Sequence, residues 1–581
     1  MRHRRAFAFS RLSVSLCAVS LLVLAACGEA PDTSGAPRVG GAPEGKEVPG
    51  PIRLSYVCGN RFLITSAYTV PVSITYRVLD SEEEGVASLS AAPPADPAFS
   101  ERLIETRTRG AVQIFLDGRP IASRDNEAVP CSPATPAPAF LTASSSTAGE
   151  WTAPFDWPIV AVHLSLLPTG KVLSFGKAGT PQLWDPQTGV FSSVPSPVWL
   201  FCAGHALLPD GRVLVAGGHI SDDHGLPDIT LFSSTAGTWS SGSPMVKGRW
   251  YPTTTTMGSG EVVILAGRDE AGNEVTIPEV WKNGALRQLT GAGFQLAYYP
   301  RSFLAPNGKI FVAGEQQTSR FLTISGAGSW KNSAVRKFGV RDYGAAVMYD
   351  DGKILYVGGG HTTNTAEIID LNQSPPKWQW TGSMAFARRH LNATVLPTGD
   401  VLVTGGVSGT GFNDLNTGVT AAELWSPSTS QWVTLASSIV TRGYHATSIL
   451  LPDGRVLHTG SGDGATDPRQ LNAEIFSPPY LFAGTRPTIG SAPVTVRYGT
   501  TFAVQSADAA SIDKVSLIRL GSTTHSFDMN QRYRTLPFTK SGTTLTVTAP
   551  TVRNRTPPGH YMLFLVTSAG VPSVAKIVRI K

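Results

Sequence analysis

The stretch Leu208-Pro-Asp-Gly-Arg-Val-Leu-Val-Ala-Gly-Gly218 decides the fold, because its pattern recurs along the chain. A turn that ends on glycine leads into an apolar strand, and another glycine follows that strand. Glycine suits both places, since it adopts positive φ in tight turns and lets inner strands pack closely. Seven turns of this kind occur, namely Leu167-Pro-Thr-Gly170, Leu208-Pro-Asp-Gly211, Met257-Gly-Ser-Gly260, Ala305-Pro-Asn-Gly308, Tyr349-Asp-Asp-Gly352, Leu396-Pro-Thr-Gly399 and Leu451-Pro-Asp-Gly454.

The spacing of these turns indicates a repeat protein. Successive turn glycines lie 41, 49, 48, 44, 47 and 55 residues apart, near the roughly 50-residue period of kelch repeats. The sequence therefore predicts a seven-bladed kelch-type β-propeller over residues 151–478. A propeller does not define a function, because the fold serves binding proteins and enzymes alike.

The segments on either side of the predicted propeller also have β character. Residues 51–132 contain alternating apolar runs such as Val72–Val78, and they predict a small N-terminal β domain. A linker rich in Pro, Ala and Ser follows at 133–150. The repeat stops at Pro478, and short β runs separated by turns predict a C-terminal immunoglobulin-like β-sandwich over 479–581. The expected fold class is all-β.

The N-terminus has the order of a secretory signal, with a basic stretch, an apolar run and small residues before a cysteine. Leu24-Ala-Ala-Cys27 is similar to a bacterial lipobox, so we expect residues 1–27 to be a lipoprotein signal and Cys27 to carry the lipid. Residues 28–50 are then a flexible tether to the membrane. The expected location is extracytoplasmic, at the bacterial outer membrane or the cell surface. Ordinary cleavage with an incidental Cys27 is the alternative.

The formal net charge of +6 does not indicate a nucleic-acid partner. Without the signal residues Arg2, Arg4, Arg5 and Arg11, the 48 basic residues become 44, against 42 acidic ones. The mature chain is thus near neutrality, whereas nucleic-acid binding calls for a basic surface.

The five cysteines limit the possible disulfides. Cys17 leaves with the signal and Cys27 is lipidated, so Cys58, Cys131 and Cys202 remain in an oxidising compartment. Cys58 and Cys131 bracket the N-terminal β domain and are the expected disulfide partners. That pairing leaves Cys202 to be explained.

Four short segments carry a specific resemblance. Leu200-Phe-Cys202, Arg249-Trp-Tyr251, Arg442-Gly-Tyr-His445 and Thr524-His525 occur in this order, the first three at blade-equivalent places. Together with Pro557-Pro-Gly-His-Tyr-Met-Leu-Phe564, they resemble the copper-site segments and the C-terminal domain of the copper radical oxidases. That family contains galactose oxidase and glyoxal oxidase, and the resemblance covers roughly residues 150–581.

The resemblance implies a site and a chemistry. Cys202 would be joined by a thioether to the ring of Tyr251, which makes a redox cofactor from the protein itself. Copper would be held by Tyr251, Tyr444, His445 and His525, and imidazole nitrogens with phenolate oxygens suit this metal. Tyr444 would be the general base, the Tyr251 radical would take a hydrogen atom from the substrate, and O₂ would be reduced to H₂O₂.

Residues near the implied site favour the glyoxal oxidase branch. Galactose oxidase has a tryptophan shortly after the diglycine in the blade of the cross-linked tyrosine, where this sequence has Leu265-Ala-Gly-Arg-Asp-Glu270. The implied substrate is a small aldehyde or a primary alcohol, with Trp250, Arg268 and Arg301 as candidate pocket residues. The other histidines are interpreted as surface or packing residues, and His205 is the best candidate among them for supporting the site.

A non-catalytic kelch propeller that acts in surface adhesion or sugar binding is the alternative hypothesis. Taken singly, a buried cysteine or a tyrosine at a blade start is usually structural. Their joint occurrence in the family order favours the enzyme, and copper content separates the two hypotheses.

Overall fold

The computed structural model describes residues 52–58, 60–66, 72–79, 81–89, 100–126, 145–462 and 467–581. The chain forms two compact units, which meet in the sequence at residues 129 and 130. Cys27, Cys131 and the side chain of Cys58 lie outside the described residues, so the signal, the tether and the Cys58–Cys131 disulfide stay predictions. No helix in the described ranges is long and apolar enough to cross a membrane.

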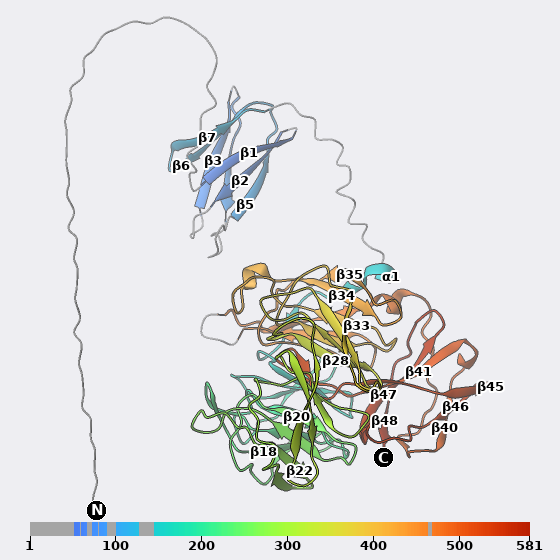
Figure 1. The fold of residues 1–581 in the computed structure, drawn as a ribbon. Helices are drawn as coiled ribbons and strands as arrows, with labels where there is room; N and C mark the ends of the chain where they lie inside the picture. Colours follow the sequence, from blue (N-terminus) through green and yellow to red (C-terminus); the bar gives the residue numbers. More distant parts are fainter. Residues whose placement is uncertain are drawn as a thin grey trace, which may run out of the picture. The chain divides into compact units, whose positions relative to one another are not determined.

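The N-terminal unit has two antiparallel sheets with a shared apolar core (Figure 1). One sheet has the order β1 (Ile52–Cys58), β2 (Arg61–Ser66) and β5 (Ser100–Glu105), and the other has the order β4 (Glu84–Leu89), β3 (Val72–Val78), β6 (Val112–Leu116) and β7 (Arg119–Arg124). Alternate side chains such as Phe62, Ile74 and Ile114 are fully buried. The period-two pattern of the sequence therefore buries one face of each sheet.

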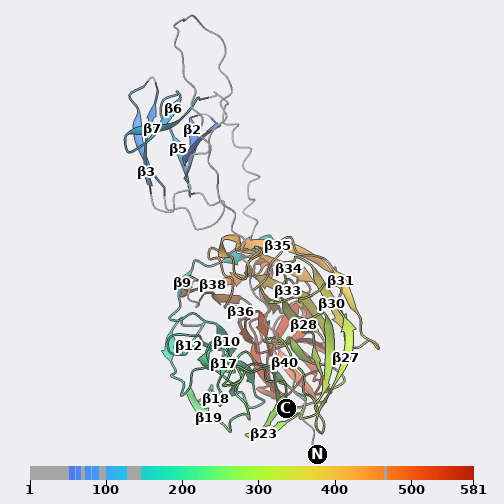
Figure 2. The ribbon, with the colours of Figure 1, turned by 60° about the vertical axis from the view of Figure 1, so that its left-hand side comes forward.

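The second unit begins with seven successive sheets of four or more strands within its described residues (Figure 2), and a two-stranded sheet of β16 (His219–Ser221) and β17 (His224–Gly225) follows β15. Their strands, sheet by sheet, are β10 (His163–Leu166), β11 (Val172–Phe175), β12 (Gln182–Trp184), β13 (Phe191–Ser193); β14 (Gly204–Leu207), β15 (Val213–Ala216), β18 (Ile229–Ser233), β19 (Thr238–Ser241); β20 (Thr253–Thr256), β21 (Val262–Leu265), β22 (Glu279–Lys282), β23 (Ala285–Gln288); β24 (Ser302–Leu304), β25 (Ile310–Val312), β26 (Thr318–Thr323), β27 (Ser329–Val335); β28 (Ala345–Asp350), β29 (Lys353–Val357), β30 (Ala366–Asp370), β31 (Trp378–Thr381); β32 (Asn392–Val395), β33 (Val401–Thr404), β34 (Ala421–Ser426), β35 (Gln431–Ser437); and β36 (Ala446–Leu450), β37 (Val456–Gly460), β38 (Asn472–Ser477) with β8 (Glu150–Trp151) and β9 (Phe155–Asp156).

Each turn motif of the sequence joins the first two strands of one of these sheets. In the second sheet, for example, Leu207 of β14 pairs with Val213 of β15, and the turn between them contains Gly211 at φ +96°. Glycine takes this φ without the clash that a Cβ introduces. The start of the unit also closes the last sheet, because Trp151 of β8 pairs with Phe476 of β38. The predicted all-β propeller architecture is confirmed.

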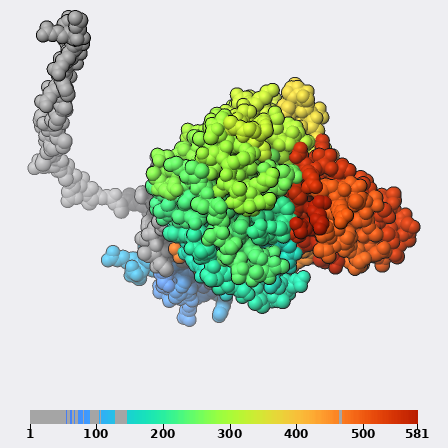
Figure 3. All heavy atoms as spheres, turned by 90° about the horizontal axis from the view of Figure 1, so that it is seen from below, coloured from blue at the N-terminus to red at the C-terminus, as the bar shows by residue number. Residues whose placement is uncertain are grey.

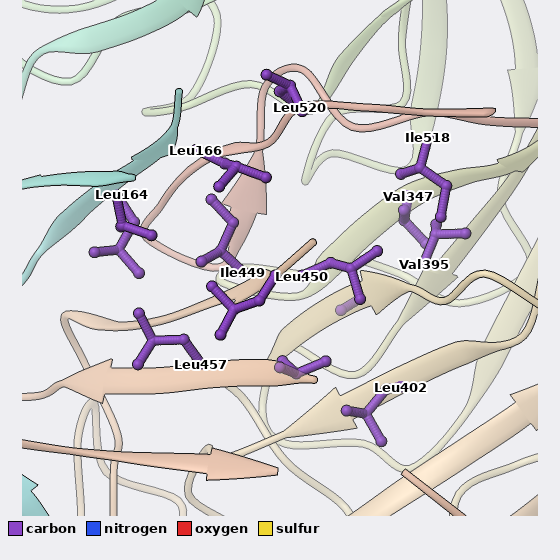
Figure 4. Close-up of a cluster of buried hydrophobic side chains, with 14 of the residues drawn as sticks. Leu164, Leu166, Val347, Val395, Leu402, Ile449, Leu450, Leu457, Ile518 and Leu520 are labelled. Atoms are coloured by element: carbon purple, nitrogen blue, oxygen red, sulfur yellow. The ribbon is translucent and has the colours of Figure 1, made fainter. Parts of the chain in front are cut away.

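The C-terminal residues form a sandwich that packs against the propeller (Figure 3). One sheet has the order β39 (Thr495–Val496), β48 (Lys576–Ile580), β47 (Gly559–Thr567), β41 (Ile512–Arg519) and β44 (Tyr533–Leu536), and the other has β40 (Thr501–Gln505), β46 (Thr544–Thr548) and β45 (Phe538–Ser541). Ile518 and Leu520 join the buried cluster of the propeller, which includes Leu164, Ile449 and Val395 (Figure 4). The sandwich and the propeller therefore share a core.

A hairpin leaves the sandwich and enters the propeller. Its strands are β42 (Ser522–Thr524) and β43 (Phe527–Asp528), and β42 pairs antiparallel with β10, with Thr524 opposite His163. The hairpin thus adds to the first sheet of the propeller. His525 lies in its turn.

Four of the sheets repeat a buried ion pair. The pairs are Arg249–Glu279, Arg341–Glu367, Arg388–Glu423 and Arg442–Glu474, and all eight side chains are fully buried. Each arginine stands two residues before a tyrosine or histidine at the entry to a first strand, namely Tyr251, Tyr343, His390 and Tyr444. The ion pairs therefore anchor the segments that present these side chains.

Candidate active site

The candidate site lies where the chain enters the first strands of three sheets and in the turn of the β42–β43 hairpin. Cys202, Tyr251, His445 and His525 occupy these places with φ of 61°, 65°, 68° and 46°. Positive φ is uncommon in residues with a Cβ and costs energy, and such residues concentrate at functional sites. All four are at most 5% exposed. Four strained, buried residues from distant parts of the chain therefore occur in one arrangement.

Hydrogen bonds and ring contacts bring the four predicted copper ligands together. The hydroxyl groups of Tyr251 and Tyr444 are hydrogen-bonded, and Nε2 of His525 lies 3.0 Å from the Tyr251 hydroxyl. The ring of His445 stacks on that of Tyr444 with centroids 3.8 Å apart, and it lies 4.8 Å from the His525 ring. The four side chains therefore form one cluster.

The two imidazoles are oriented as metal ligands. Nδ1 of His445 lies 2.6 Å from the carbonyl oxygen of Gly462 and must donate to it, because a carbonyl only accepts. Its Nε2 therefore keeps a lone pair, and this atom is buried with no hydrogen-bond partner among the described residues. An imidazole whose second nitrogen donates to a carbonyl is the usual form of a metal-binding histidine. An unpartnered buried nitrogen beside two phenols fits a copper ion.

His525 is oriented in the same way. Its Nδ1 lies 2.6 Å from Oγ1 of Thr524, and that hydroxyl donates to the carbonyl of Val162 at 2.9 Å. The hydroxyl therefore accepts from Nδ1, and Nε2 keeps its lone pair toward Tyr251. Within the described part of the chain, no three His, Cys, Asp or Glu side chains gather as a metal-binding group.

Burial keeps the ligands uncharged before a metal binds. It raises the pKa of Tyr251 well above the usual value, with Cys202 as the next largest cause, and it also raises the pKa of Tyr444. Burial lowers the pKa of His445 to about 4. Neutral imidazoles are ready to bind, whereas each phenol becomes a phenolate only when a cation compensates its charge.

A backbone hydrogen bond joins Cys202 and Tyr251. The N–H of Tyr251 donates to the carbonyl of Cys202 at 2.8 Å, and both side chains belong to one buried cluster. The N–H of Cys202 donates to Nε2 of His163 at 3.1 Å. His163 was expected to be a packing residue, but this bond holds the Cys202 segment in place. His205, the expected supporting histidine, lies behind His163 with ring centroids 5.2 Å apart.

Trp250 covers the ring of Tyr251. The two rings stack with centroids 3.8 Å apart and planes 15° apart. The indole N–H of Trp250 donates to Nδ1 of His219 at 3.1 Å. Trp250 therefore covers Tyr251, although no tryptophan stands shortly after Ala266-Gly267, where galactose oxidase has one after its diglycine.

A cavity of about 660 Å³ adjoins the cluster. Its wall includes Arg268, Tyr298, Arg301, Glu315, Asp342 and Tyr343. The ring of Tyr298 meets that of Tyr251 edge to face at 5.2 Å, and the ring of Tyr343 meets that of Tyr444 at 5.4 Å. Two residues of the cavity wall therefore contact the tyrosines of the cluster, and two of the three candidate pocket residues, Arg268 and Arg301, line the cavity.

Arg301 has a second role as a buried support. Its guanidinium donates to the carbonyls of Tyr299, Gly344 and His525 at 2.7–3.1 Å. These bonds fasten the His525 turn to two neighbouring blade entries. Arg268 instead forms ion pairs with Glu274 and Asp223 at 3.3 and 3.7 Å near the cavity mouth.

Sequence reasoning missed three side chains beside Tyr444. The Tyr343 ring meets that of Tyr444 edge to face at 5.4 Å, and the Phe412 ring meets it at 4.9 Å while Phe412 stays 49% exposed. His390 donates to the Phe412 carbonyl at 2.5 Å. A signal for two of them was present, because Tyr343 and His390 follow a blade-entry arginine by two residues, as Tyr251 and Tyr444 do. Phe412 lies in an irregular loop without such a signal.

The fold and the site together define a class: a β-propeller with a buried cluster of two tyrosines and two histidines beside a polar cavity. Two family models match the chain, the glyoxal oxidase N-terminus over residues 358–480 and the galactose oxidase-like early set domain over residues 486–580.

Individual known proteins are similar to this chain in sequence and in structure. Galactose oxidase of Gibberella zeae is 32% identical over 494 residues, which cover 76% of this chain and 72% of that protein. The aldehyde oxidase GLOX of Vitis pseudoreticulata is 30% identical over 444 residues, covering 65% and 82%. A solved structure of a fungal alcohol oxidase in complex with copper matches with a TM-score of 0.68 and 26% identity over 75% of this chain and 100% of that one. The chain belongs to the copper radical oxidase family of galactose oxidase and glyoxal oxidase.

Proposed function

We propose that this protein oxidises a small aldehyde or a primary alcohol with O₂ and releases H₂O₂, using copper and a Cys202–Tyr251 thioether. The observation that carries the proposal is the unpartnered, buried Nε2 of His445 in a cluster with Tyr251, Tyr444 and His525. The names of the relatives support it, since they are a galactose oxidase, an aldehyde oxidase and a copper-bound alcohol oxidase.

The four clustered side chains are the copper ligands in this proposal. Bound there, copper supplies a one-electron redox centre and a Lewis acid that acidifies a substrate hydroxyl. Thr524 and Gly462 hold the two imidazoles in the required tautomer through Nδ1. Arg301 holds the His525 turn in place.

The thioether forms from neighbouring side chains. One hydrogen leaves the Cys202 thiol and one leaves the Tyr251 ring, a C–S bond forms, and O₂ takes up both hydrogens as H₂O₂. The backbone bond between the two residues and the bond from Cys202 to His163 keep the partners close. Besides copper, no organic cofactor is needed.

Tyr444 and Tyr251 have different roles in the oxidation of the substrate. The phenolate oxygen of Tyr444 accepts the proton of the substrate hydroxyl, and the radical oxygen of Tyr251 accepts a hydrogen atom from the adjacent carbon. A hydrated aldehyde offers the same hydroxyl and hydrogen as a primary alcohol. Loss of two hydrogens from the substrate balances reduction of O₂ to H₂O₂.

The volume and the wall of the cavity suit small polar substrates. Its volume of about 660 Å³ exceeds that of a small aldehyde, and its wall presents carboxyl, amide, guanidinium and phenol groups. Such groups hydrogen-bond hydroxyls and hydrated carbonyls. Arg268 and Tyr298 stand at its wall beside Trp250, whose ring meets that of Tyr298 at 5.4 Å.

Copper loading and product formation test the proposal together. Aerobic loading should give one copper per chain, and a coupled H₂O₂ assay over aldehydes, primary alcohols and sugars should find turnover. His445→Ala should lose copper, while His224→Ala, on a histidine at the β17 strand away from the cluster, should retain it. Copper-free protein after loading, or copper without any turnover across the screen, would contradict the proposal.

We also propose an extracytoplasmic, lipid-anchored location, which rests on Leu24-Ala-Ala-Cys27. Labelled fatty acid should enter the wild-type chain and not Cys27→Ala, and that variant should appear in the soluble fraction. A variant that remains labelled and membrane-bound would rule out the lipobox interpretation. An anchored oxidase would release H₂O₂ outside the cytoplasm.

A further inference from the structure

A chain of aromatic side chains leads from Tyr251 to the protein surface. Trp250 stacks on Tyr251, its indole N–H donates to His219 at 3.1 Å, and the ring of His219 meets that of Trp199 at 4.4 Å. Trp250 is 8% exposed, whereas Trp199 is 46% exposed. Each step is a contact between neighbouring groups.

Trp199 is held in this position from two sides. Its indole N–H donates to the carbonyl of Lys177 at 2.7 Å, and its own carbonyl accepts from the N–H of His219 at 2.9 Å. An exposed tryptophan is usually mobile at the surface, but these two bonds fix the ring against His219. Asp222 lies 3.7 Å from Nε2 of His219 and 3.1 Å from Nζ of Lys177.

We infer that Trp199 and Trp250 form an electron-transfer route by which a one-electron oxidant in solution converts Tyr251 to its radical. The inference rests on the proposed function, because only a radical cofactor needs such a route. Indole is one of the readily oxidised side chains, and electron transfer slows exponentially with distance, so short steps between contacting rings outpace one long step. The oxidant accepts the electron from Trp199 at the protein surface.

The electron balance is simple. The oxidant gains one electron from Trp199, Trp199 regains one from Trp250 by way of His219, and Trp250 regains one from the Tyr251 phenolate. The net change is one oxidant reduced and one tyrosyl radical formed, with no bond made or broken. The oxidant is an outer-sphere metal complex or a redox protein, which need not enter the cavity.

The cavity offers a competing route that the experiment must separate. Tyr298 also meets Tyr251, at 5.2 Å, and it lines the cavity wall. A small oxidant that entered the cavity would reach Tyr251 through Tyr298 without Trp199. The two routes therefore make opposite predictions for variants of Trp199 and Tyr298.

The test measures the rate of radical formation in the copper-loaded protein. The protein is first reduced to the radical-free form and then mixed with hexachloroiridate(IV), and the tyrosyl-radical absorbance is followed by stopped flow. Trp199→Phe keeps an aromatic ring but not an oxidisable one, and it should slow radical formation by roughly tenfold or more. Trp199→Tyr restores an oxidisable ring and should recover most of the rate.

Two controls separate this route from packing effects. Trp380→Phe changes a tryptophan that is 50% exposed in another sheet, and it should leave the rate within about twofold of wild type. Turnover of the fully oxidised Trp199 and Trp380 variants with a substrate found in the H₂O₂ screen should also stay within about twofold, since neither residue belongs to the ligand cluster or the cavity wall.

The inference is overturned if Trp199→Phe forms the radical at the wild-type rate, or if Tyr298→Phe alone slows it. Equal slowing in Trp199→Phe and Trp199→Tyr also overturns it, because that result assigns the effect to packing. Failure of the proposed function looks different, because the wild-type protein itself then gives no radical absorbance.

Discussion

At the scale of single residues, the surroundings of Tyr251 and Tyr444 differ although their hydroxyl groups are bonded to each other. Tyr251 is covered by Trp250 and adjoins Cys202. Tyr444 instead stacks on His445 and meets the half-exposed ring of Phe412. The buried, covered ring suits a long-lived radical, and the ring nearer solvent suits proton exchange.

Tyr444→Phe tests this division. The variant keeps three ligands and the Cys202–Tyr251 pair, so it should bind copper and form the cross-link. It loses the general base, and kcat should fall by roughly 10² to 10⁴. Steady-state H₂O₂ production together with peptide mapping measures both effects, and loss of the cross-link in this variant would mean that Tyr444 acts in cofactor assembly instead.

The charge of the cavity wall depends on pH through Glu315. Burial raises its pKa to about 7, and the Asp342 carboxylate beside it adds to the shift. A raised pKa means that the carboxyl stays protonated below about pH 7 and becomes negative above it. The cavity wall therefore gains one negative charge as the pH passes through neutrality.

This charge should repel anionic substrates. The KM for an anionic aldehyde such as glyoxylate should rise by roughly three- to tenfold between pH 6 and pH 8, since one more charge at this range costs an anion about 1 kcal/mol. Glu315→Gln should flatten the profile, and a neutral aldehyde of similar size serves as the control substrate. An unchanged profile in Glu315→Gln would assign the pH dependence to another group.

The sequence predicted which residues lie together in the cluster, but it did not predict the residues that support them. Cys202, Tyr251, Tyr444 and His445 stand in short motifs at blade starts, where sequence and family resemblance agree. His163 gave no signal, because its role comes from a hydrogen bond to the backbone of Cys202. A packed histidine and a supporting one look identical in sequence.

At the scale of elements, the buried ion pairs explain how strained entry segments persist. Arg388 donates to the carbonyls of Gly405 and Ala421 as well as to Glu423, and Glu423 accepts the N–H of Ala385. Each pair thus ties a blade entry to two strands of the same sheet. A buried arginine that is paired with a carboxylate and hydrogen-bonded to carbonyls avoids the cost of an uncompensated charge.

Glu423→Ala should be strongly destabilising, by about 3–5 kcal/mol, because it leaves the buried Arg388 without its carboxylate. Asp210→Ala removes the partner of Arg212 in an exposed pair and should cost about 0–1 kcal/mol. Denaturant midpoints of the metal-free proteins compare the two variants. Equal midpoints would show that the buried pair does not support the sheet.

The strands and turns of the propeller could be predicted because each is determined by a short stretch of sequence. An example is Leu208-Pro-Asp-Gly211, which forms the turn between β14 and β15. The hairpin β42–β43 could not be predicted, although Thr524-His525 was noticed. Its pairing with β10 joins residues from opposite ends of the second unit. Only the three-dimensional fold shows that the hairpin extends a propeller sheet.

At the scale of the whole second unit, the site depends on propeller and sandwich together. Cys202, Tyr251 and His445 come from three different sheets, and His525 comes from the sandwich hairpin. Ile518 and Leu520 fix that sandwich to the propeller core. The site can therefore assemble only when both parts are folded and packed, which explains why the motifs are so widely spaced in the sequence.

The measurement that tests the central claim most directly is the mass of the copper-loaded protein. After aerobic loading and removal of the metal, the wild-type polypeptide should be lighter by two hydrogens than protein that was never loaded. The peptides containing Cys202 and Tyr251 should remain joined after reduction, which breaks a disulfide but not a thioether. Cys202→Ser should show neither change and should lose nearly all H₂O₂ production. Separate Cys202 and Tyr251 peptides in an active wild-type enzyme, or full activity in Cys202→Ser, would contradict the account.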